Sequence, residues 1–143
     1  MKAQKEAEAY VRKKLFEKEG MAFSEQKVAL SRTNNEGEFK FDAVDAKKEI
    51  AINISTSSLF TVTGKEGSGK VHKIRSDMFF LFLAKVKERR VVFTEKDMYD
   101  YFAKQKKAGR VPTKIKLQYM ELPPMLRQKV EDDRAKAVAE VKP

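Results

Sequence analysis

The chain of 143 residues contains no cysteine and a single histidine. Without cysteine it can form neither disulfide bonds nor thiolate metal sites, and with one histidine a metal ion would be held mainly by oxygen ligands. No apolar run approaches the roughly 20 residues that a membrane span requires, and the beginning of the sequence, MKAQKEAEAY, is too polar for a signal peptide. We therefore expect a soluble, cytoplasmic protein that has no membrane partner.

The chain is rich in apolar residues that cluster in periodic blocks. Hydrophobic residues make up 41% of it, which favours a folded globular protein over a disordered one. The length suffices for one hydrophobic core and is too short for two good ones. We expect a single domain that covers residues 1–143.

Positive charge is in excess, because 31 Lys and Arg residues stand against 21 Asp and Glu and give a formal net charge of +10. Such an excess favours polyanionic partners, of which nucleic acid is the first expectation, with DNA ahead of RNA. A basic balance also occurs in proteins that bind no nucleic acid. A structural or protein-interaction domain is therefore an alternative.

Residues 38–58 show an alternating pattern that predicts two β-strands joined by a tight turn at residues 45–48. The alternating apolar residues are Phe39, Phe41, Ala43, Ile50, Ile52 and Ile54. Asp42 lies in the middle of the first strand. Asn53 and Ser55 share the face of the second strand that is opposite to the isoleucines, because successive side chains alternate. This polar face is where we expect any chemistry to occur.

Periodicity and turn residues predict the other elements. We expect helices at residues 2–19, 71–88, 95–107 and 124 to about 141, and strands at 27–30, 90–93 and 114–120. Thr94 and Asp97 have the spacing of a capping box at the start of the third helix. The order predicts an α/β sandwich in which a three-stranded antiparallel meander and crossover strands form a mixed sheet flanked by helices.

The second predicted helix, residues 71–88, is apolar on every side, which is typical of a helix buried between layers. Its three phenylalanines, Phe79, Phe80 and Phe82, are interpreted as core rather than as platforms for nucleic-acid bases.

The order of elements around Asp42 and Asn53-Ile54-Ser55 resembles the core of the PD-(D/E)xK nucleases, the restriction-endonuclease-like superfamily, over roughly residues 2–93. Those enzymes carry an Asp on the second strand and Glu-Xaa-Lys on the third. Asp42 matches their Asp, and Asn53-Ile54-Ser55 falls where their Glu-Xaa-Lys lies. The resemblance implies a restriction-endonuclease-like fold, a catalytic site at Asp42, Asn53 and Ser55, Mg²⁺ as the cofactor of an active site, and possible homodimers.

Two of the three signature residues differ from the family pattern. Asn53 brings no negative charge and Ser55 no cation, so Asp42 would face a metal ion nearly alone and catalysis should be impaired. A rearranged site is the alternative, in which a carboxylate of the first helix and a cation near the second replace them. The residues considered for these roles are Glu6, Glu8, Lys70, Lys73 and Arg75. In a third interpretation Asp42 is an ordinary strand residue.

Two basic clusters are candidates for contacts with phosphate groups. They comprise Lys70, Lys73 and Arg75, and Lys106, Lys107 and Arg110. The second cluster is equally typical of a helix end whose cations suit the helix dipole. The segment 64–70 also satisfies the G-x-x-x-x-G-K part of a nucleotide-binding loop, but Val71 follows where a hydroxyl is needed for Mg²⁺.

The sequence therefore predicts a nucleic-acid-binding protein of nuclease-like fold with impaired catalysis and no cofactor. The alternatives are an active nuclease that uses a divalent metal in a rearranged site, and a structural or protein-interaction domain.

Overall fold

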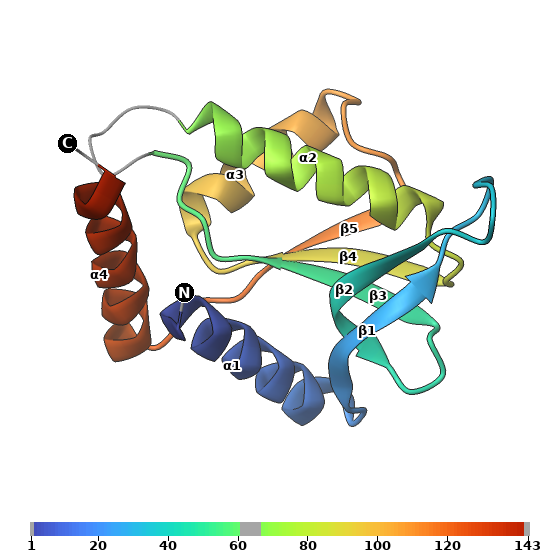
Figure 1. Cartoon of the computed structure of the whole chain (residues 1–143), viewed down its shortest axis with the longest axis horizontal. Coiled ribbons are helices and arrows are strands. Elements are labelled where there is room, and N and C mark those ends of the chain that lie inside the picture. Colours follow the sequence, from blue (N-terminus) through green and yellow to red (C-terminus); the bar gives the residue numbers. More distant parts are fainter. Residues whose placement is uncertain (1, 61–66, 142–143) are drawn as a thin grey trace.

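The computed structural model describes residues 2–60 and 67–141, with side chains up to residue 137. A five-stranded mixed sheet forms the centre and helices cover both of its faces (Figure 1). The elements are α1 (Lys2–Glu19), β1 (Phe23–Ala29), β2 (Glu38–Asp45), β3 (Ile50–Ser55), α2 (Ser68–Leu83), β4 (Glu88–Phe93), α3 (Lys96–Lys107), β5 (Ile115–Tyr119) and α4 (Pro124–Val141). The prediction of an α/β class is confirmed. No helix in the described part of the chain has the length and apolar composition to cross a bilayer.

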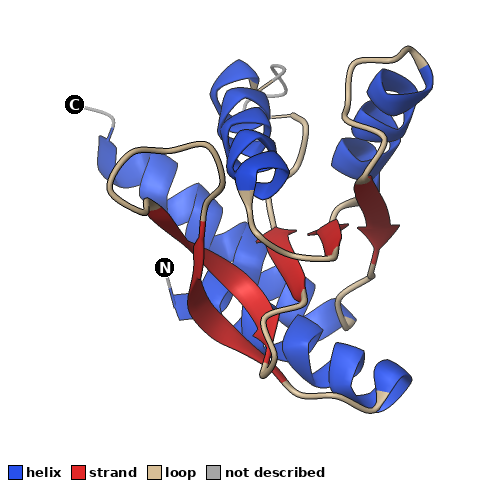
Figure 2. Cartoon of the chain, turned by 90° about the vertical axis from the view of Figure 1, so that its right-hand side faces the viewer, coloured by secondary structure: helices blue, strands red, loops and turns tan. Residues whose placement is uncertain are grey.

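The strands lie in the order β1-β2-β3-β4-β5. The first three pair antiparallel, whereas β3, β4 and β5 pair parallel. The crossover connections between the parallel strands contain α2 and α3, which lie together on one side of the sheet (Figure 2). The predicted meander and crossover strands are thus confirmed.

The turn between β2 and β3 is held by Asp45. This buried carboxylate accepts hydrogen bonds from the main-chain N–H groups of Glu49 and Ile50, both at 2.8 Å. Lys48 adopts the left-handed conformation with φ of 54° that closes the turn. The turn predicted at residues 45–48 is confirmed, and it fixes the register of the hairpin.

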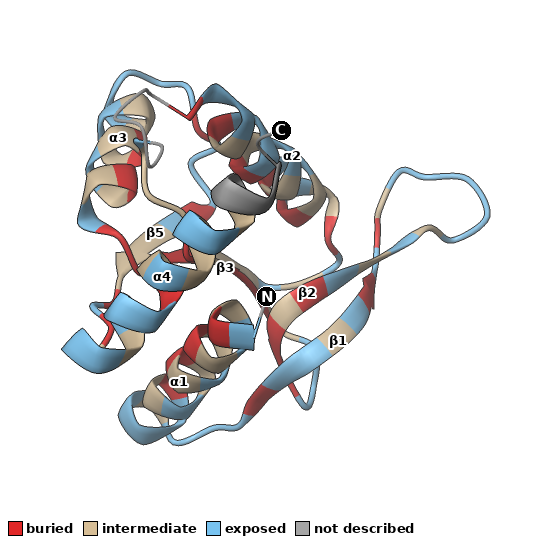
Figure 3. Ribbon diagram, turned by 60° about the vertical axis from the view of Figure 1, so that its left-hand side comes forward, coloured by how far each residue is buried: buried red, intermediate tan, exposed pale blue. Residues whose placement is uncertain are grey.

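The two faces of the sheet bury separate apolar clusters. On the α1 side, Val11 and Leu15 pack with the isoleucines of β3. On the α2 side, Leu81 packs with Phe93 and Phe102. The buried sides of α1 and α2 face the sheet and their other sides are exposed (Figure 3). The face assignments predicted for β3 are therefore confirmed.

Helix α4 packs beside α1 through a small cluster of apolar residues. Its members are Ala3, Ala7, Leu122 and Val130. At the other end of α1, both carboxylate oxygens of Glu19 accept hydrogen bonds from Arg90 of β4, at 2.7 and 2.6 Å. These contacts fix one end of α1 against α4 and the other end against the sheet.

The predicted bounds of α2 were wrong. The helix begins at Ser68 and ends at Leu83, instead of covering residues 71–88. At Ala84 the backbone becomes extended and forms an isolated antiparallel bridge with Leu30, and Lys85 N–H donates to Ala29 O at 2.9 Å. The chain thus leaves the helix early because it pairs with the end of β1. Strand β1 also begins earlier than predicted, at Phe23. The buried side chain of Phe23 packs in the apolar cluster on the α1 side of the sheet.

The prediction that Phe79 and Phe82 are core residues was also wrong. Their side chains are 57% and 48% exposed. The buried stripe of α2 consists of Val71, Ile74, Met78 and Leu81. Of the three phenylalanines, only Phe80 is partly buried, and its ring stacks on Phe39 with centroids 4.3 Å apart.

The capping box predicted for α3 is absent from the structure. The N-cap residue is Glu95, and it makes no capping bond through its side chain. Asp97 instead accepts hydrogen bonds from Ser58 Oγ at 2.6 Å and from Leu59 N–H at 3.0 Å. Asp97 therefore fastens the segment that follows β3 to the start of α3.

The glycine-rich segment predicted as a loop at 64–70 is partly helical, because Ser68, Gly69 and Lys70 form the first turn of α2. Residues 61–66, which include the first three residues of that segment, lie outside the described residues.

Candidate functional site

Asp42 lies where β2 and β3 separate. In the described chain these strands pair only at Ala43 with Ile52 and at Val44 with Ala51. Next to this short ladder, Asp42 Oδ2 accepts a hydrogen bond of 2.8 Å from the main-chain N–H of Ile54. The carboxylate therefore occupies the fork between the strands, beside the residue that separates Asn53 from Ser55.

Asn53 and Ser55 take part in local structure. Asn53 is buried, and its Nδ2 donates to the carbonyl oxygen of Asp77 in α2 at 3.5 Å. Ser55 Oγ accepts a hydrogen bond of 3.4 Å from the N–H of Ser57. Neither side chain brings a charge to the fork. Their main role in the described structure is to hold α2 and the end of β3 in place.

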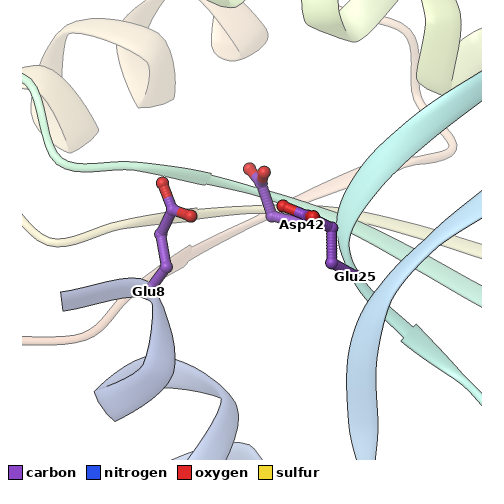
Figure 4. A group of neighbouring side chains, drawn as sticks. All are labelled: Glu8, Glu25 and Asp42. Carbon is purple, nitrogen blue, oxygen red and sulfur yellow. The ribbon is translucent and has the colours of Figure 1, made fainter. Parts of the chain in front are cut away.

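Three carboxylates meet beside the fork. Glu8 of α1, Glu25 of β1 and Asp42 of β2 each offer an oxygen, and these oxygens lie within 4.8 Å of one another (Figure 4). We call these three residues the carboxylate cluster. It combines elements that are far apart in the sequence, and α1 contributes the carboxylate that the rearranged-site alternative requires.

Glu8 was among the residues considered from the sequence, but Glu25 was missed. The predicted strand began at residue 27, and the sequence carries no signal for the β-bulge that the structure contains between Ser24 and Gln26. The extra residue of this bulge belongs to β2, because Asp42 and Ala43 of β2 stand against the single residue Glu25 of β1. The bulge therefore sets the position of Glu25 relative to Asp42.

Glu6, the other acidic residue considered on α1, lies elsewhere. Its carboxylate pairs with Lys129 of α4 at 3.6 Å.

The environment of Asp42 disfavours its charged form. Burial raises its pKa to about 6, the hydrogen bond from Ile54 N–H acts in the opposite direction, and the charges of Glu8 and Asp77 raise it further. The nearby Lys73 lowers it.

Glu25 is exposed and pairs with Lys40 at 3.2 Å, so the unfavourable charge belongs mainly to the half-buried Asp42. A proton or a bound cation would therefore stabilise Asp42.

The dimensions of the carboxylate cluster suit a divalent cation. Two oxygens bound to one Mg²⁺ at about 2.1 Å lie at most about 4.2 Å apart, and two bound to Ca²⁺ at about 2.4 Å at most about 4.8 Å apart. The cluster oxygens, within 4.8 Å of one another, are thus close enough to bind one divalent cation together after a small closure. Asp42 has two further carboxylates beside it, so it would not face a cation alone.

Two basic side chains border the fork. Lys73 of α2 pairs with Asp77 at 3.3 Å and remains 76% exposed, so it can also meet a ligand in solution. Burial raises the pKa of Asp77 and the adjacent Lys73 opposes this rise. Arg12 of α1 donates to the main-chain oxygen of Asp42 at 3.0 Å. Arg12 thereby fixes the backbone that carries the carboxylate.

The remaining basic candidates lie away from the fork. Arg75 turns toward α3, where it donates to Gln105 Oε1 at 2.8 Å and to the main-chain oxygen of Arg110 at 3.1 Å. Lys106 donates to the main-chain oxygen of Ile115 at 2.7 Å. The structure therefore separates Arg75 from Lys73, its neighbour in the predicted cluster.

Lys70 and Lys107 belong to neither of these groups. Burial lowers the pKa of Lys70, and the nearby charge of Arg134 lowers it further. Lys107 is exposed at the end of α3. Its position agrees with the interpretation that the cations of this helix end suit the helix dipole.

No protein-family model, no curated protein and no solved structure matches this chain. The chemistry of the site must therefore be inferred from its own geometry.

Proposed function

We propose that this protein binds nucleic acid through a restriction-endonuclease-like fold whose catalytic site is impaired. The observation that carries the proposal is the contact between Asp42 and Ile54, because it brings the aspartate beside the segment that would correspond to Glu-Xaa-Lys. The order of the five strands and the position of α1 beside the fork also agree with such a fold. The charges missing at Asn53 and Ser55 are the reason to expect impaired catalysis.

The net charge of +10 favours a polyanion as the partner. Near the fork, however, the carboxylate cluster would repel a phosphate group. A divalent cation, when bound there, would neutralise the carboxylates and supply positive charge toward a phosphate oxygen. Lys73 would add a cation from α2. We therefore expect binding near the fork to depend on a divalent metal.

An active nuclease with a rearranged site is the second candidate, and the carboxylate cluster specifically favours it. Glu8 and Glu25 would provide the negative charge that Asn53 lacks, and Lys73 would provide the cation that is absent at Ser55. Glu8, Glu25 and Asp42 would hold the metal, and Lys73 would orient an attacking water or a phosphate oxygen.

Binding is tested by fluorescence anisotropy with labelled duplex and single-stranded oligonucleotides at low salt, in EDTA and in Ca²⁺. Ca²⁺ is expected to strengthen duplex binding by the unaltered protein and to have a smaller effect on the double variant Glu8→Gln with Glu25→Gln. Glu17→Gln is the control, because it removes one carboxylate charge from an exposed position of α1 outside the cluster. If neither duplex nor single strand binds at low salt, the proposed function is wrong.

Cleavage is tested separately by nicking of supercoiled plasmid in Mg²⁺ or Mn²⁺. The second candidate predicts nicking that Asp42→Asn abolishes and Glu17→Gln leaves intact. The impaired-site proposal predicts no nicking by the unaltered protein. The double variant Asn53→Glu with Ser55→Lys carries the family residues at both positions. The same nicking assay then tests whether this variant cleaves plasmid in the presence of the metal.

A further inference from the structure

Phe79 and Phe82 form an exposed aromatic pair on the outer side of α2. They are 57% and 48% exposed, although they belong to the most apolar segment of the chain. Since they are three residues apart on a helix, they lie on the same side about one turn apart. The ring of Phe79 also packs edge-on against Phe80, with centroids 5.4 Å apart. Exposed apolar groups that gather on a surface often mark a binding site.

Three hollows of about 230, 230 and 740 Å³ lie beside Phe82, and Phe79 lines one of the two smaller ones. Phe82 lines all three. We call these three hollows together the Phe82 groove. Met78, Phe79 and Pro112 provide further apolar lining. The basic residues that line it are Arg32, Arg75, Arg89, Lys106, Arg110 and Lys114.

No acidic residue lines the Phe82 groove within the described ranges 2–60 and 67–141. A hollow near the end of β4 is different, since Glu95, Asp97, Glu131 and Asp132 accompany its two arginines. The general excess of basic residues does not therefore make every hollow of this protein cationic. The Phe82 groove combines apolar lining with one sign of charge, which suits an anionic ligand that also has apolar faces.

Three of these six basic side chains form hydrogen bonds with main-chain carbonyl groups of the protein. Arg75 donates to the carbonyl of Arg110 and Lys106 to that of Ile115, the first residue of β5. Arg89 donates to Leu81 O at 2.8 Å and to Ala84 O at 2.7 Å. Arg75 also lies 5.5 Å from the ring centroid of Phe102. Such side chains lose little further freedom when a ligand binds, because they are already ordered.

The other three cations form the rim of the groove. Arg32, Arg110 and Lys114 are exposed, and each lines a hollow that contains Phe82. Arg32 and Lys114 belong to one hollow and Arg110 to the other two. Positive charge therefore borders Phe82 in more than one direction, as an extended polyanion that passes over the ring would require.

The groove is separate from the fork that holds Asp42. On a helix, Asp77 and Phe79 are about 200° apart, since each residue adds about 100°. Asp77 and Lys73 lie toward Asp42, whereas Arg75 lies toward α3. The Phe82 groove is therefore a second surface on the other side of α2.

We propose that the Phe82 groove binds a single nucleic-acid strand, with unpaired bases stacked on Phe79 and Phe82 and phosphates bound by the rim cations. This inference rests on the proposed nucleic-acid binding and adds its substrate class. Bases in a duplex stack on one another and do not offer their faces to a phenyl ring. Phenyl rings stack on any base and form no hydrogen bonds with its edges, so binding is sequence-tolerant.

The test measures anisotropy of fluorescein-labelled (dT)12 and of a duplex of the same length, in EDTA so that no divalent metal contributes. Phe79→Ala and Phe82→Ala are each expected to weaken (dT)12 binding about tenfold, and the double variant more. Phe16→Ala is the control, because Phe16 is an exposed phenylalanine of another helix, 53% exposed, and should leave binding unchanged. Arg110→Glu provides a second variant that leaves both rings in place and should also weaken binding.

The proposal is overturned if the double variant binds (dT)12 as tightly as the unaltered protein. In that case nucleic-acid binding itself still stands, because the strand is bound elsewhere. If neither strand nor duplex binds, the proposed function fails as well. If (dT)12 does not bind but a labelled peptide of alternating Glu and Trp does, and Phe82→Ala weakens the peptide, then the groove docks an acidic protein segment and the proposal is wrong.

Discussion

The carboxylate cluster and the Phe82 groove lie on different sides of α2 and carry opposite charge. In the cluster, three acidic side chains from α1, β1 and β2 meet, and burial raises the pKa of Asp42 to about 6. In the groove, Arg75, Arg89 and Lys106 are each bound to main-chain carbonyls. The charge of Asp42 therefore opposes folding until a proton or a cation neutralises it, whereas the groove cations contribute to the fold itself.

The largest effect is expected from Asp42→Asn. The raised pKa means that the folded state holds its proton more tightly than the unfolded state, so this group stabilises the protein below about pH 4. The stabilisation disappears as pH rises to about 6. Asparagine keeps an acceptor for Ile54 N–H without the buried charge. At pH 7.5 we expect it to be more stable than the unaltered protein by up to about 3 kcal/mol in urea unfolding.

The stability difference between Asp42→Asn and the unaltered protein should shrink toward zero near pH 4. Asp100→Asn is the control, since Asp100 is an exposed residue in a surface pair with Lys96 and should show little change. If Asp42→Asn destabilises the protein at pH 7.5, the charge of Asp42 does not oppose folding as we infer.

The next largest effect is expected from Arg75→Ala, because this guanidinium joins α2 to Gln105 and to the loop at Arg110. Loss of two charge-assisted hydrogen bonds should lower the free energy of unfolding by about 2 kcal/mol. Lys104→Ala, at an exposed position of α3, should change it far less. Equal stability of the two variants would show that the groove cations do not contribute to the fold.

A smaller effect is expected from a divalent cation. For a dissociation constant of about 1 mM, 10 mM Ca²⁺ stabilises the folded state by about 1.4 kcal/mol. Thermal unfolding should show this gain at pH 7.5 and less of it at pH 5, where Asp42 is mostly protonated. The variant Glu8→Gln with Glu25→Gln should lose the gain and Glu17→Gln should keep it. A gain that all three proteins share would place the cation outside the cluster.

The smallest effect is expected from Glu8→Gln on the pKa of Asp42. Burial is the main cause of the raised pKa, and the charge of Glu8 contributes less. Carbon-13 NMR titration of the Asp42 carboxyl should therefore show a modest decrease. A return to the ordinary pKa of an aspartate would instead identify repulsion from Glu8 as the principal cause.

Some parts of the fold were predictable because they depend on neighbouring residues. Alternation predicted the hairpin of β2 and β3, and Asp45 closes its turn through bonds to residues only four and five positions away. The helical periodicity of residues 2–19 likewise predicted α1 with its observed bounds. Such local patterns report which side chains share a face of one element.

The candidate site was only partly predictable. The sequence identified Asp42, its position opposite residues 53–55, and Glu8 as one possible donor. It did not identify Glu25, because a bulge that arises from pairing with β2 determines where that side chain points. The basic residues predicted to form the first cluster do not lie together in the structure, because Lys73 and Arg75 are on different sides of α2.

The sequence by itself determined the class of the fold, the hairpin and the excess of positive charge, since these follow from composition and from patterns along one segment. The tertiary structure decided that three carboxylates from α1, β1 and β2 meet, and that Phe79 and Phe82 remain exposed among cations. The reason is physical: burial and charge proximity depend on which elements pack together. An apolar run such as residues 78–84 does not state which of its sides another element will cover.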